Sequence, residues 1–220
     1  MRTLISKFPI VAALLTLAAC TTYTGSDGNP LSRSFTWFSF VAGDDIKAAC
    51  TPDSNDHYRF VYNGVYERQI RAYELRGREE GASYSARARN EGGNLGRFAF
   101  SNPLGPWELQ KSERILTEVQ ALQIINAYNA DVAVAPNSAG QQFKSNAFYW
   151  IVASCQNGDF RIFAFDQDKV DLNALGFAVA LLANDETGVT FRKAKPVEGF
   201  DDRAFYIKIN DAADGTVGGL

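Results

Sequence analysis

The single histidine of this chain lies in an acidic loop, where it could act as a general base. His57 follows Asp53-Ser54-Asn55-Asp56, so a carboxylate of Asp53 or Asp56 could orient its imidazole. General-base catalysis needs such a pair within hydrogen-bond reach of a reacting group. The sequence contains no Gly-x-Ser-x-Gly elbow, and no other residue set supplies the remaining catalytic roles. We therefore predict an exposed loop histidine at the start of a strand and no catalytic residues.

Metal and phosphate chemistry have little support in the residue spacing. One histidine and two distant cysteines give no zinc-ligand spacing. A calcium-like run places aspartates at its positions 1, 3 and 6, namely Asp166, Asp168 and Asp171. An EF-type calcium loop instead needs an oxygen ligand at position 5, glycine at position 6 and glutamate at position 12. This run predicts a solvated turn that ends in a helix cap. Residues 92–96 are glycine-rich but lack the ending of a phosphate loop, so they are interpreted as a loose connection. We expect no metal and no cofactor.

Arginine is the residue type whose distribution suggests a binding surface. Between residues 57 and 100 there are eight arginines and no lysine. A guanidinium binds carboxylate or phosphate through a planar fork and suits partly buried interfaces. Arg87 and Arg89 share a strand face because side chains alternate along a strand. The candidate anion- or partner-binding residues are Arg59, Arg87, Arg89, Tyr58 and Tyr84.

The same arginines also have a purely structural interpretation. Cross-strand ion pairs on a solvated sheet face would satisfy them, and the glutamates available are Glu67, Glu74, Glu79, Glu80 and Glu91. The two interpretations differ in one observable. A recognition site requires guanidinium groups that converge on an accessible surface beside Tyr58 or Tyr84, without a glutamate for each of them.

Runs of β-forming residues predict the strands that must position these side chains. Asn63-Gly64 separates residues 58–62 from 65–75, and Asn157-Gly158 separates residues 147–155 from 159–165. Asn-Gly is a strong hairpin signal because a type I′ turn needs two positive φ angles. Further strands are predicted at residues 35–41, 83–89, 97–100, 188–193 and 204–209. Asp44 or Asp45 is expected to cap a short turn through residues 46–49.

Two segments have helical periodicity. Thr117-Glu118-Val119-Gln120 is a capping-box candidate. Two sets of apolar residues follow at helical spacing, namely Val119, Leu122 and Ile125, and Ala121, Ile124 and Tyr128. The second helix is predicted over residues 171–183, with Asp171 as its cap and a stripe of Leu172, Leu175, Val179 and Leu182. The expected fold is α+β, a largely antiparallel sheet with two helices packed on one face.

The first twenty residues combine a basic start, a short apolar run and Leu17-Ala18-Ala19-Cys20. The apolar run has the length of a signal peptide rather than of a membrane-spanning helix. This segment resembles the lipobox of bacterial lipoproteins, Leu-(Ala/Ser)-(Gly/Ala)-Cys. The resemblance implies cleavage before Cys20, a diacylglycerol thioether on Cys20 and acylation of the new amine. In such lipoproteins aspartate after the cysteine is the usual inner-membrane signal, so Thr21 implies the outer membrane. The alternative is an ordinary secretory signal with a chance cysteine.

The lipobox resemblance sets the expected organisation of the chain. Residues 1–19 form the signal peptide, 20–34 a lipidated flexible tether, 35–210 a single globular α+β domain, and 211–220 a flexible tail. The net charge of −3 becomes −5 without residues 1–19, which carry two basic and no acidic residues. A mildly acidic chain does not suggest nucleic acid as a partner. The expected partners are the membrane, through the N-terminal lipid, and an envelope protein.

The cysteine count predicts one disulfide. With Cys20 assigned to lipid, Cys50 and Cys155 remain, and an oxidising compartment favours their pairing. The alternative is two separately buried thiols, because sequence alone cannot test the distance between them.

Three functions remain open at this point. The first is a non-catalytic envelope lipoprotein, a binding or assembly module tethered to the outer membrane. The second is a periplasmic ligand-binding protein for a small anion, glycan or lipid, which a concave pocket with convergent polar groups would favour. The third is a cell-wall-acting enzyme with unrecognised carboxylate catalysis, which two carboxylates about 5–10 Å apart in a cleft would favour.

Overall fold

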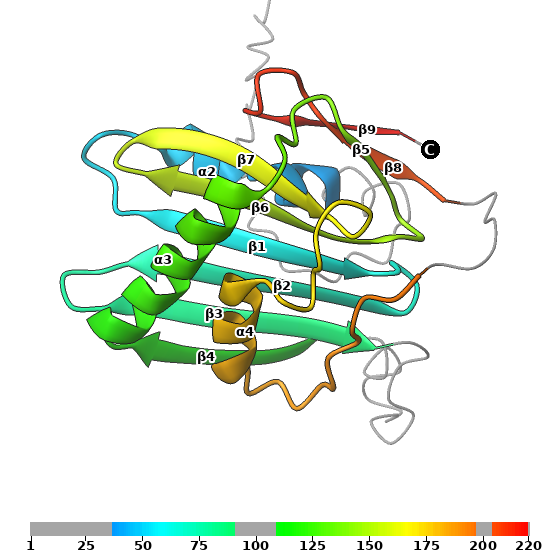
Figure 1. Ribbon diagram of the computed structural model, residues 1–220. Coiled ribbons are helices and arrows are strands. Elements are labelled where there is room, and N and C mark those ends of the chain that lie inside the picture. The colour runs from blue at the N-terminus through cyan, green and yellow to red at the C-terminus, as the bar shows by residue number, and fades with distance from the viewer. Residues whose placement is uncertain (1–36, 91–108, 197–203, 220) are drawn as a thin grey trace, which may run out of the picture.

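Strand-forming residues assemble into two antiparallel sheets (Figure 1). The computed structural model describes residues 37–90, 109–196 and 204–219. The larger sheet has six strands in the order β4-β3-β2-β1-β6-β7, and the smaller has three in the order β5-β8-β9. The elements are α2 (Asp44–Ala49), β1 (His57–Gly64), β2 (Gln69–Gly77), β3 (Ala82–Asn90), β4 (Gln110–Leu116), α3 (Glu118–Val134), β5 (Gln142–Lys144), β6 (Phe148–Gln156), β7 (Asp159–Asp166), α4 (Gly176–Ala183), β8 (Tyr206–Ile209) and β9 (Thr216–Gly219). The predicted α+β class with a largely antiparallel sheet is confirmed.

Strand alternation divides the large sheet between two hydrophobic cores. Tyr58, Phe60 and Tyr62 of β1 point to the side covered by α3 and α4, which we call the α3/α4 face. The intervening Val61 points to the opposite side, which we call the α2 face. Figure 1 shows α3 and α4 in front of the sheet and α2 behind β6 and β7. Because β6 is covered on both faces, its first eight residues are all buried.

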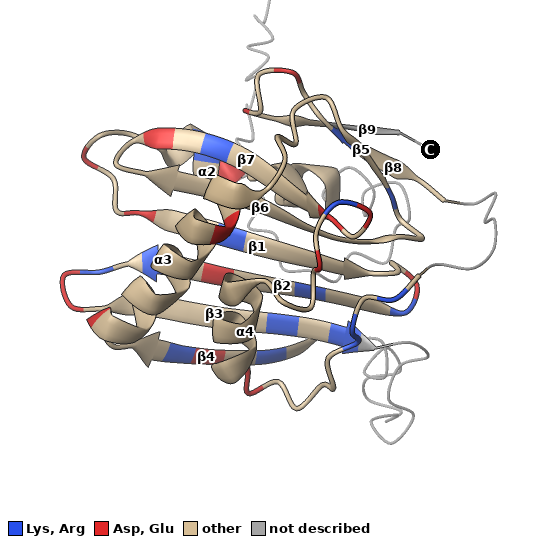
Figure 2. Cartoon of the chain, in the orientation of Figure 1, with Lys and Arg blue, Asp and Glu red and all other residues tan. Residues whose placement is uncertain are grey.

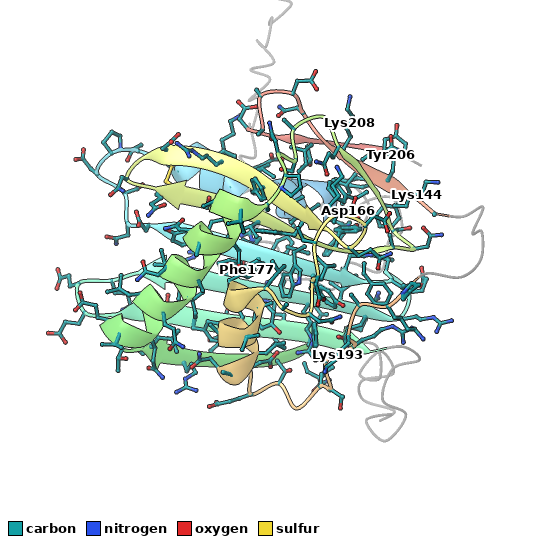
Figure 3. The ribbon with its side chains drawn as sticks, in the orientation of Figure 1. Lys144, Asp166, Phe177, Lys193, Tyr206 and Lys208 are labelled. Carbon is teal, nitrogen blue, oxygen red and sulfur yellow. A yellow bond between two sulfur atoms is a disulfide. The ribbon has the colours of Figure 1, made fainter. Side chains whose placement is uncertain are left out.

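An aromatic cluster fixes α4 to the α3/α4 face. The ring centroid of Phe177, labelled in Figure 3, lies 5.4 Å from that of Phe60 and 5.3 Å from that of Trp150. It also lies 5.1 Å from the ring of Phe165. Edge-to-face and offset aromatic pairs add stability beyond the area that they bury. One side chain therefore anchors a helix of only eight residues.

Helix α3 begins where the capping box predicts. The Thr117 side chain accepts a hydrogen bond from the Gln120 amide, and the Gln120 side chain accepts one from the Thr117 amide. Of the two apolar sets, Ala121, Ile124 and Tyr128 face the core. Val119 and Leu122 of the other set are 76% and 45% exposed. The sequence predicted the helix but could not tell which set faces the sheet.

Helix α4 is shorter than predicted and starts at Gly176 rather than near residue 171. Asp171 does not cap it, since its side chain accepts a hydrogen bond from the Asn173 amide within the preceding turn. The cap comes from α3 instead, where Asp131 accepts a hydrogen bond from the Phe177 amide at 3.0 Å. A Cβ on Gly176 would meet that of Ala127 at 3.4 Å, so the two helices approach closely. Val179, expected in the apolar stripe, is 57% exposed.

The two Asn-Gly pairs have different fates. Asn157 and Gly158 have φ angles of 52° and 78° and connect β6 to β7, which confirms that hairpin turn. Asn63 and Gly64 instead complete β1, and the turn follows at Val65 with a φ of 65°. The physical reason is burial. Asn63 is fully buried and its amide nitrogen donates to the carbonyls of Ser145 and Ala147, which it could not do from a turn.

Residues 37–42 are helical, which corrects the strand predicted at 35–41. Trp37, Phe40 and Val41 are buried, and their i, i+3, i+4 spacing is helical rather than alternating. Gly43 ends this helix and precedes α2 with a φ of 68°, and a Cβ there would lie 2.5 Å from that of Ala153. Helix α2 forms as expected, but neither Asp44 nor Asp45 is its N-cap, which is Gly43.

The C-terminal third also departs from expectation. Residues 188–193 form no strand, because their carbonyls bond to side chains of the sheet. Gln69 donates to the Thr190 carbonyl at 2.8 Å and Tyr62 to that of Arg192 at 2.6 Å. Beneath this segment the buried Arg71 guanidinium pairs with Asp185. Residues 216–219, expected within a flexible tail, form β9 and pair with the predicted strand β8.

Two further points concern the remaining predictions. The strand predicted at residues 97–100 and the loop at 92–96 lie outside the described residues. Within the described ranges, no helix is both long and apolar enough to cross a membrane.

Candidate functional site

The structure separates the five predicted binding residues by sheet face. Tyr58 and Tyr84 are each 1% exposed on the α3/α4 face, and the Tyr84 hydroxyl donates to the Leu181 carbonyl at 2.8 Å. Arg59, Arg87 and Arg89 occupy alternate positions that point to the α2 face. The two tyrosines therefore cannot share a surface with the three arginines, and the predicted mixed site does not form.

Arg59 is a structural residue rather than a recognition residue. It is 3% exposed, and its guanidinium binds both Asp45 carboxylate oxygens at 2.7 Å. It also lies 3.1 Å from a Glu74 oxygen and donates to the Phe40 carbonyl at 3.0 Å. The guanidinium carbon stacks 4.0 Å from the centroid of the Phe40 ring. Arg59 therefore ties the 37–49 helices to the sheet. Its cross-strand pair with Glu74 agrees with the structural interpretation, whereas its burial and its pair with Asp45 were not expected.

His57 belongs to the same network, which corrects its predicted exposure and the general-base interpretation, while its predicted place at the start of a strand is confirmed. It is the first residue of β1 with a side chain 14% exposed, so it is not an exposed loop residue. Its Nε2 lies 3.4 Å from a Glu74 oxygen and 3.1 Å from the Arg76 Nε. Asp56 instead accepts a hydrogen bond from the Asn157 amide at 2.9 Å. A general-base pair with Asp53 or Asp56 is therefore absent from the described structure.

Glu74 is the electrostatic centre of this network. Burial alone would raise the pKa of Glu74, but its hydrogen bond with His57 and the charge of Arg59 outweigh burial. With further help from Arg76, they lower the pKa to about 2. The Glu74 side chain is only 12% exposed. Its negative charge is thus the form that the folded state selects.

The Glu74 carboxylate should make stability pH-dependent. Its folded pKa lies below the unfolded value of 4.5, so the stabilisation is present above about pH 4.5 and is lost as the pH falls towards 2. The full contribution is about 3 kcal/mol. We expect the difference in unfolding free energy between the wild type and Glu74→Gln, measured with urea, to be about 2 kcal/mol smaller at pH 3 than at pH 7.

Glu113→Gln is the matched control for that measurement. Glu113 is exposed and makes no ion pair with any described residue, so its substitution should give no pH-dependent difference. An equal difference between the wild type and Glu74→Gln at both pH values would contradict the assignment.

Arg87 and Arg89 form an accessible site with a third residue, Lys111 of β4. Cross-strand pairing places Lys111 directly opposite Arg87 on the α2 face. Directly opposite Cβ atoms lie about 4.5–5.5 Å apart, and like charges there are destabilising. Among the described residues, no carboxylate forms an ion pair with Arg87, Arg89 or Lys111. Figure 2 shows basic positions on the neighbouring strands β3 and β4. We call Arg87, Arg89 and Lys111 the cationic face.

Local contacts hold one member of the cationic face in place. The Arg89 Nη2 donates to the Tyr66 carbonyl at 3.0 Å, and its guanidinium carbon lies 5.4 Å from the Tyr66 ring centroid. Tyr66 in turn packs edge-on against Phe205 at 4.8 Å. Arg87 has two small neighbours on the same sheet face. Ala72 lies directly opposite it on β2, and Ser85 lies two residues before it on β3. Small side chains therefore flank Arg87 on its sheet face.

Sequence reasoning missed Lys111 because it missed β4. Residues 110–116 alternate, with Lys111, Glu113 and Ile115 on the α2 face and Leu116 in the opposite core. No apolar–polar alternation marks this strand in the sequence, because Gln110, Ser112 and Arg114 take the positions on the α3/α4 face. The pairing with Arg87 could not be inferred either, because it depends on the register between strands joined by a long connection.

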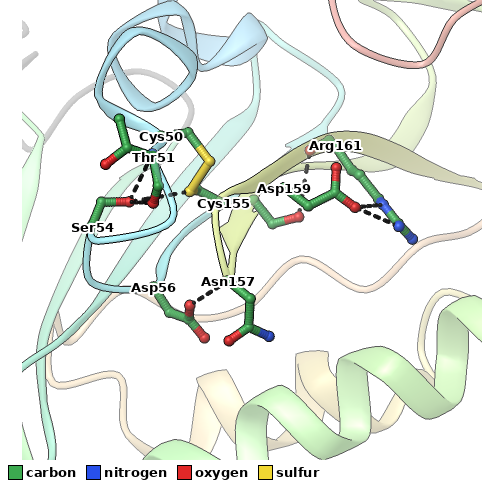
Figure 4. Close-up of a disulfide and its surroundings, with 9 residues drawn as sticks. Cys50, Thr51, Ser54, Asp56, Cys155, Asn157, Asp159 and Arg161 are labelled. Atoms are coloured by element: carbon green, nitrogen blue, oxygen red, sulfur yellow. Dashed lines mark hydrogen bonds and ion pairs between the residues drawn. A yellow bond between two sulfur atoms is a disulfide. The ribbon is translucent and has the colours of Figure 1, made fainter.

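The cysteines lie as predicted. The sulfurs of Cys50 and Cys155 are 1.94 Å apart and the Cα atoms 5.6 Å apart (Figure 4). This disulfide-distance pair links the end of α2 to the end of β6. The Ser54 hydroxyl lies 3.6 Å from the Cys155 sulfur. Cys20 lies outside the described residues.

The candidate calcium run serves as a set of local caps. Asp166 accepts a hydrogen bond from the Asp168 amide at 3.0 Å, and Asp171 accepts one from the Asn173 amide at 2.9 Å. No group of three or more metal-ligating side chains occurs within residues 37–90, 109–196 and 204–219.

No family model, curated protein or solved structure matches the chain.

Proposed function

We propose that this protein is a non-catalytic envelope lipoprotein, a binding or assembly module tethered to the outer membrane by lipid on Cys20. Its cationic face binds an acidic surface of another envelope protein. The observation that carries the proposal is the unneutralised pair of Arg87 and Lys111 at directly opposed positions. Such a pair costs folding stability. A binding role accounts for that cost, because an acidic partner supplies the missing counter-charge.

The surroundings of the cationic face favour a protein partner over a small anion. The same sheet face presents Glu113 and a 57% exposed Ile115. Non-obligate protein interfaces combine apolar and charged groups in this way, whereas small-ligand sites are concave and bury most of the ligand. Mixed charge also gives specificity, since a mismatched partner would place like charges together.

A double substitution separates binding from folding. Arg87→Ala with Lys111→Ala should weaken partner binding by at least about tenfold, since each lost charge-assisted contact is worth about 1.5 kcal/mol or more. The unfolding free energy should stay constant or rise by a few tenths of a kcal/mol, because a like-charge pair is removed. Binding is measured by photo-cross-linking in intact membranes from a reactive residue at Ser85, which lies on the α2 face between Glu74 and Glu113.

Two controls define the outcome. Arg161→Ala with Lys169→Ala removes the same charge from exposed positions elsewhere and should leave the cross-link unchanged. Rising salt should weaken the cross-link of the wild-type protein, because exposed charges are screened within about 8–10 Å. A cross-link to lipid alone, or one that survives both the alanine pair and high salt, would refute an acidic protein partner.

A further inference from the structure

Side chains alternate along β5 and β8, so the smaller sheet has a buried face and an outer face. The buried face joins the core on the α2 face, and its members are Phe143, Ile207 and Ile209. The other face carries side chains that are half-buried or exposed. Its members, which we call the outer face of the small sheet, are Gln142, Lys144, Tyr206 and Lys208.

Strand pairing brings the two lysines of the outer face together around a tyrosine. Lys144 lies directly opposite Tyr206, and Lys208 lies directly opposite Gln142. Residues in such a diagonal arrangement lie about 7–8 Å apart, so both ammonium groups can contact one surface. Among the described residues, no carboxylate forms an ion pair with Lys144 or Lys208. Figure 3 labels both lysines and Tyr206 on the neighbouring strands β5 and β8.

The N-terminal segment enters the domain next to this face. The structure describes the chain from residue 37, and Phe38 packs edge-on against Phe205 with ring centroids 5.5 Å apart. Phe205 directly precedes Tyr206 in the sequence. Its carbonyl accepts a hydrogen bond from the amide of Ser145, just after β5, at 2.9 Å. A membrane that holds the N-terminal end of the chain is therefore tethered to this side of the domain.

The proposed lipid on Cys20 makes a weak surface contact effective. Trp37 follows Cys20 by 17 positions (37 minus 20), which span at most about 60 Å of chain. A short linker turns the surface contact into an intramolecular step with an effective concentration of about the millimolar range. Two basic residues near an anionic leaflet favour the contact roughly 20- to 30-fold. Tyrosine suits the same boundary, because its ring is apolar and its hydroxyl is polar.

We propose that the outer face of the small sheet lies against an anionic phospholipid surface, in the membrane that holds the lipid on Cys20. Lys144 and Lys208 pair with lipid phosphates, and the Tyr206 ring lies at the level of the headgroups. The contact fixes the orientation of the domain on the membrane. This inference rests on the proposed lipid anchor and goes beyond it, because it assigns the bilayer a surface distinct from the cationic face.

The test uses the lipidated wild-type chain on vesicles of phosphatidylcholine, with and without about 30% phosphatidylglycerol as the anionic lipid. Methylation by formaldehyde and a reductant, followed by mass spectrometry, reports the access to each lysine. We expect Lys144 and Lys208 to react at least about threefold more slowly on the anionic vesicles, and about 0.5 M salt should abolish the difference. Lys193 is exposed and follows Arg192, whose carbonyl binds Tyr62 of the α3/α4 face, so it should react equally fast on both.

A pair of double variants provides an independent measurement of orientation. A solvent-sensitive fluorophore on Gln142→Cys should shift to the blue on anionic vesicles, and Lys144→Gln with Lys208→Gln should remove the shift. This double variant should keep its melting temperature, since surface substitutions usually change stability little. Lys193→Gln with Arg161→Gln removes the same charge from the α3/α4 side of the domain and should retain the shift.

The outcomes separate this inference from the proposed function. A wild-type chain that floats with neither vesicle has no lipid anchor, which overturns both. A chain that floats, but whose Lys144 and Lys208 react equally fast on both vesicles, overturns the phospholipid contact and leaves the anchor standing. Protection of these lysines in native membranes but on neither vesicle would assign the face to a protein and overturn the contact as well. A blue shift that survives in Lys144→Gln with Lys208→Gln would also overturn it.

Discussion

A Cys20→Ser variant should lose the stable attachment to the outer membrane that the proposed function requires. Acyl chains contribute roughly 0.8 kcal/mol per buried methylene, and two or three of them make release slow. Serine cannot form the thioether, so the variant should take up no labelled palmitate. It should accumulate as uncleaved precursor or appear in the soluble fraction. Palmitate labelling and density fractionation of membranes measure both effects.

The other cysteines provide the matched control for this result. Cys50→Ala also removes a thiol but lies in the folded domain, so it should retain label and membrane attachment. In the lipoprotein that we propose, Thr21→Asp with Cys20 retained should shift the chain towards the inner membrane. A cleaved Cys20→Ser protein that stays in the outer membrane would show that the lipobox interpretation is wrong.

Loss of the Cys50–Cys155 pair should have the largest effect on folding stability. The two residues are 105 positions apart, so a bridge closes most of the described domain into one loop. In the chain-entropy model such a loop is worth about 4–5 kcal/mol. We expect Cys50→Ala with Cys155→Ala to lower the unfolding free energy by about 2–5 kcal/mol, measured with urea under non-reducing conditions.

Reduction of the wild-type protein distinguishes the bridge from simple packing loss. A reductant should lower the urea midpoint of the wild type towards that of the double variant, whose own midpoint should not respond. Mass spectrometry of unreduced peptides should recover the joined pair. Rapid alkylation of both thiols in the native protein would instead support the alternative of two free cysteines.

The two outcomes for arginine show why residue type alone did not identify the site. Arg59 and Arg87 point to the same face of one sheet, two strands apart. Arg59 lies under the 37–49 helices, where Asp45 and Glu74 surround it. Arg87 lies beyond those helices, and its direct neighbour on β4 is Lys111. Burial and counter-charge, rather than sequence context, decide which arginine is structural and which can bind a partner.

Local chemistry in the sequence determined several elements by itself. The Thr117–Gln120 capping box starts α3, and Asn157-Gly158 forms the turn between β6 and β7. Both signals act within a few residues, through hydrogen bonds or φ preferences that need no distant partner. The even number of cysteines left after Cys20 likewise predicted the Cys50–Cys155 pair. The alternation of residues 83–89 predicted β3 and placed Arg87 and Arg89 on one face.

Tertiary structure alone decided the surroundings of these elements. Burial against segments far along the chain decides which stripe of α3 faces the sheet. It also decides that Asn63 belongs to β1 rather than to a turn. The cationic face depends on the register of β3 against β4, since a shift of one residue would turn Lys111 to the other face. Local propensities can be inferred from sequence because they act between neighbours, whereas packing partners are set by the free energy of the whole fold.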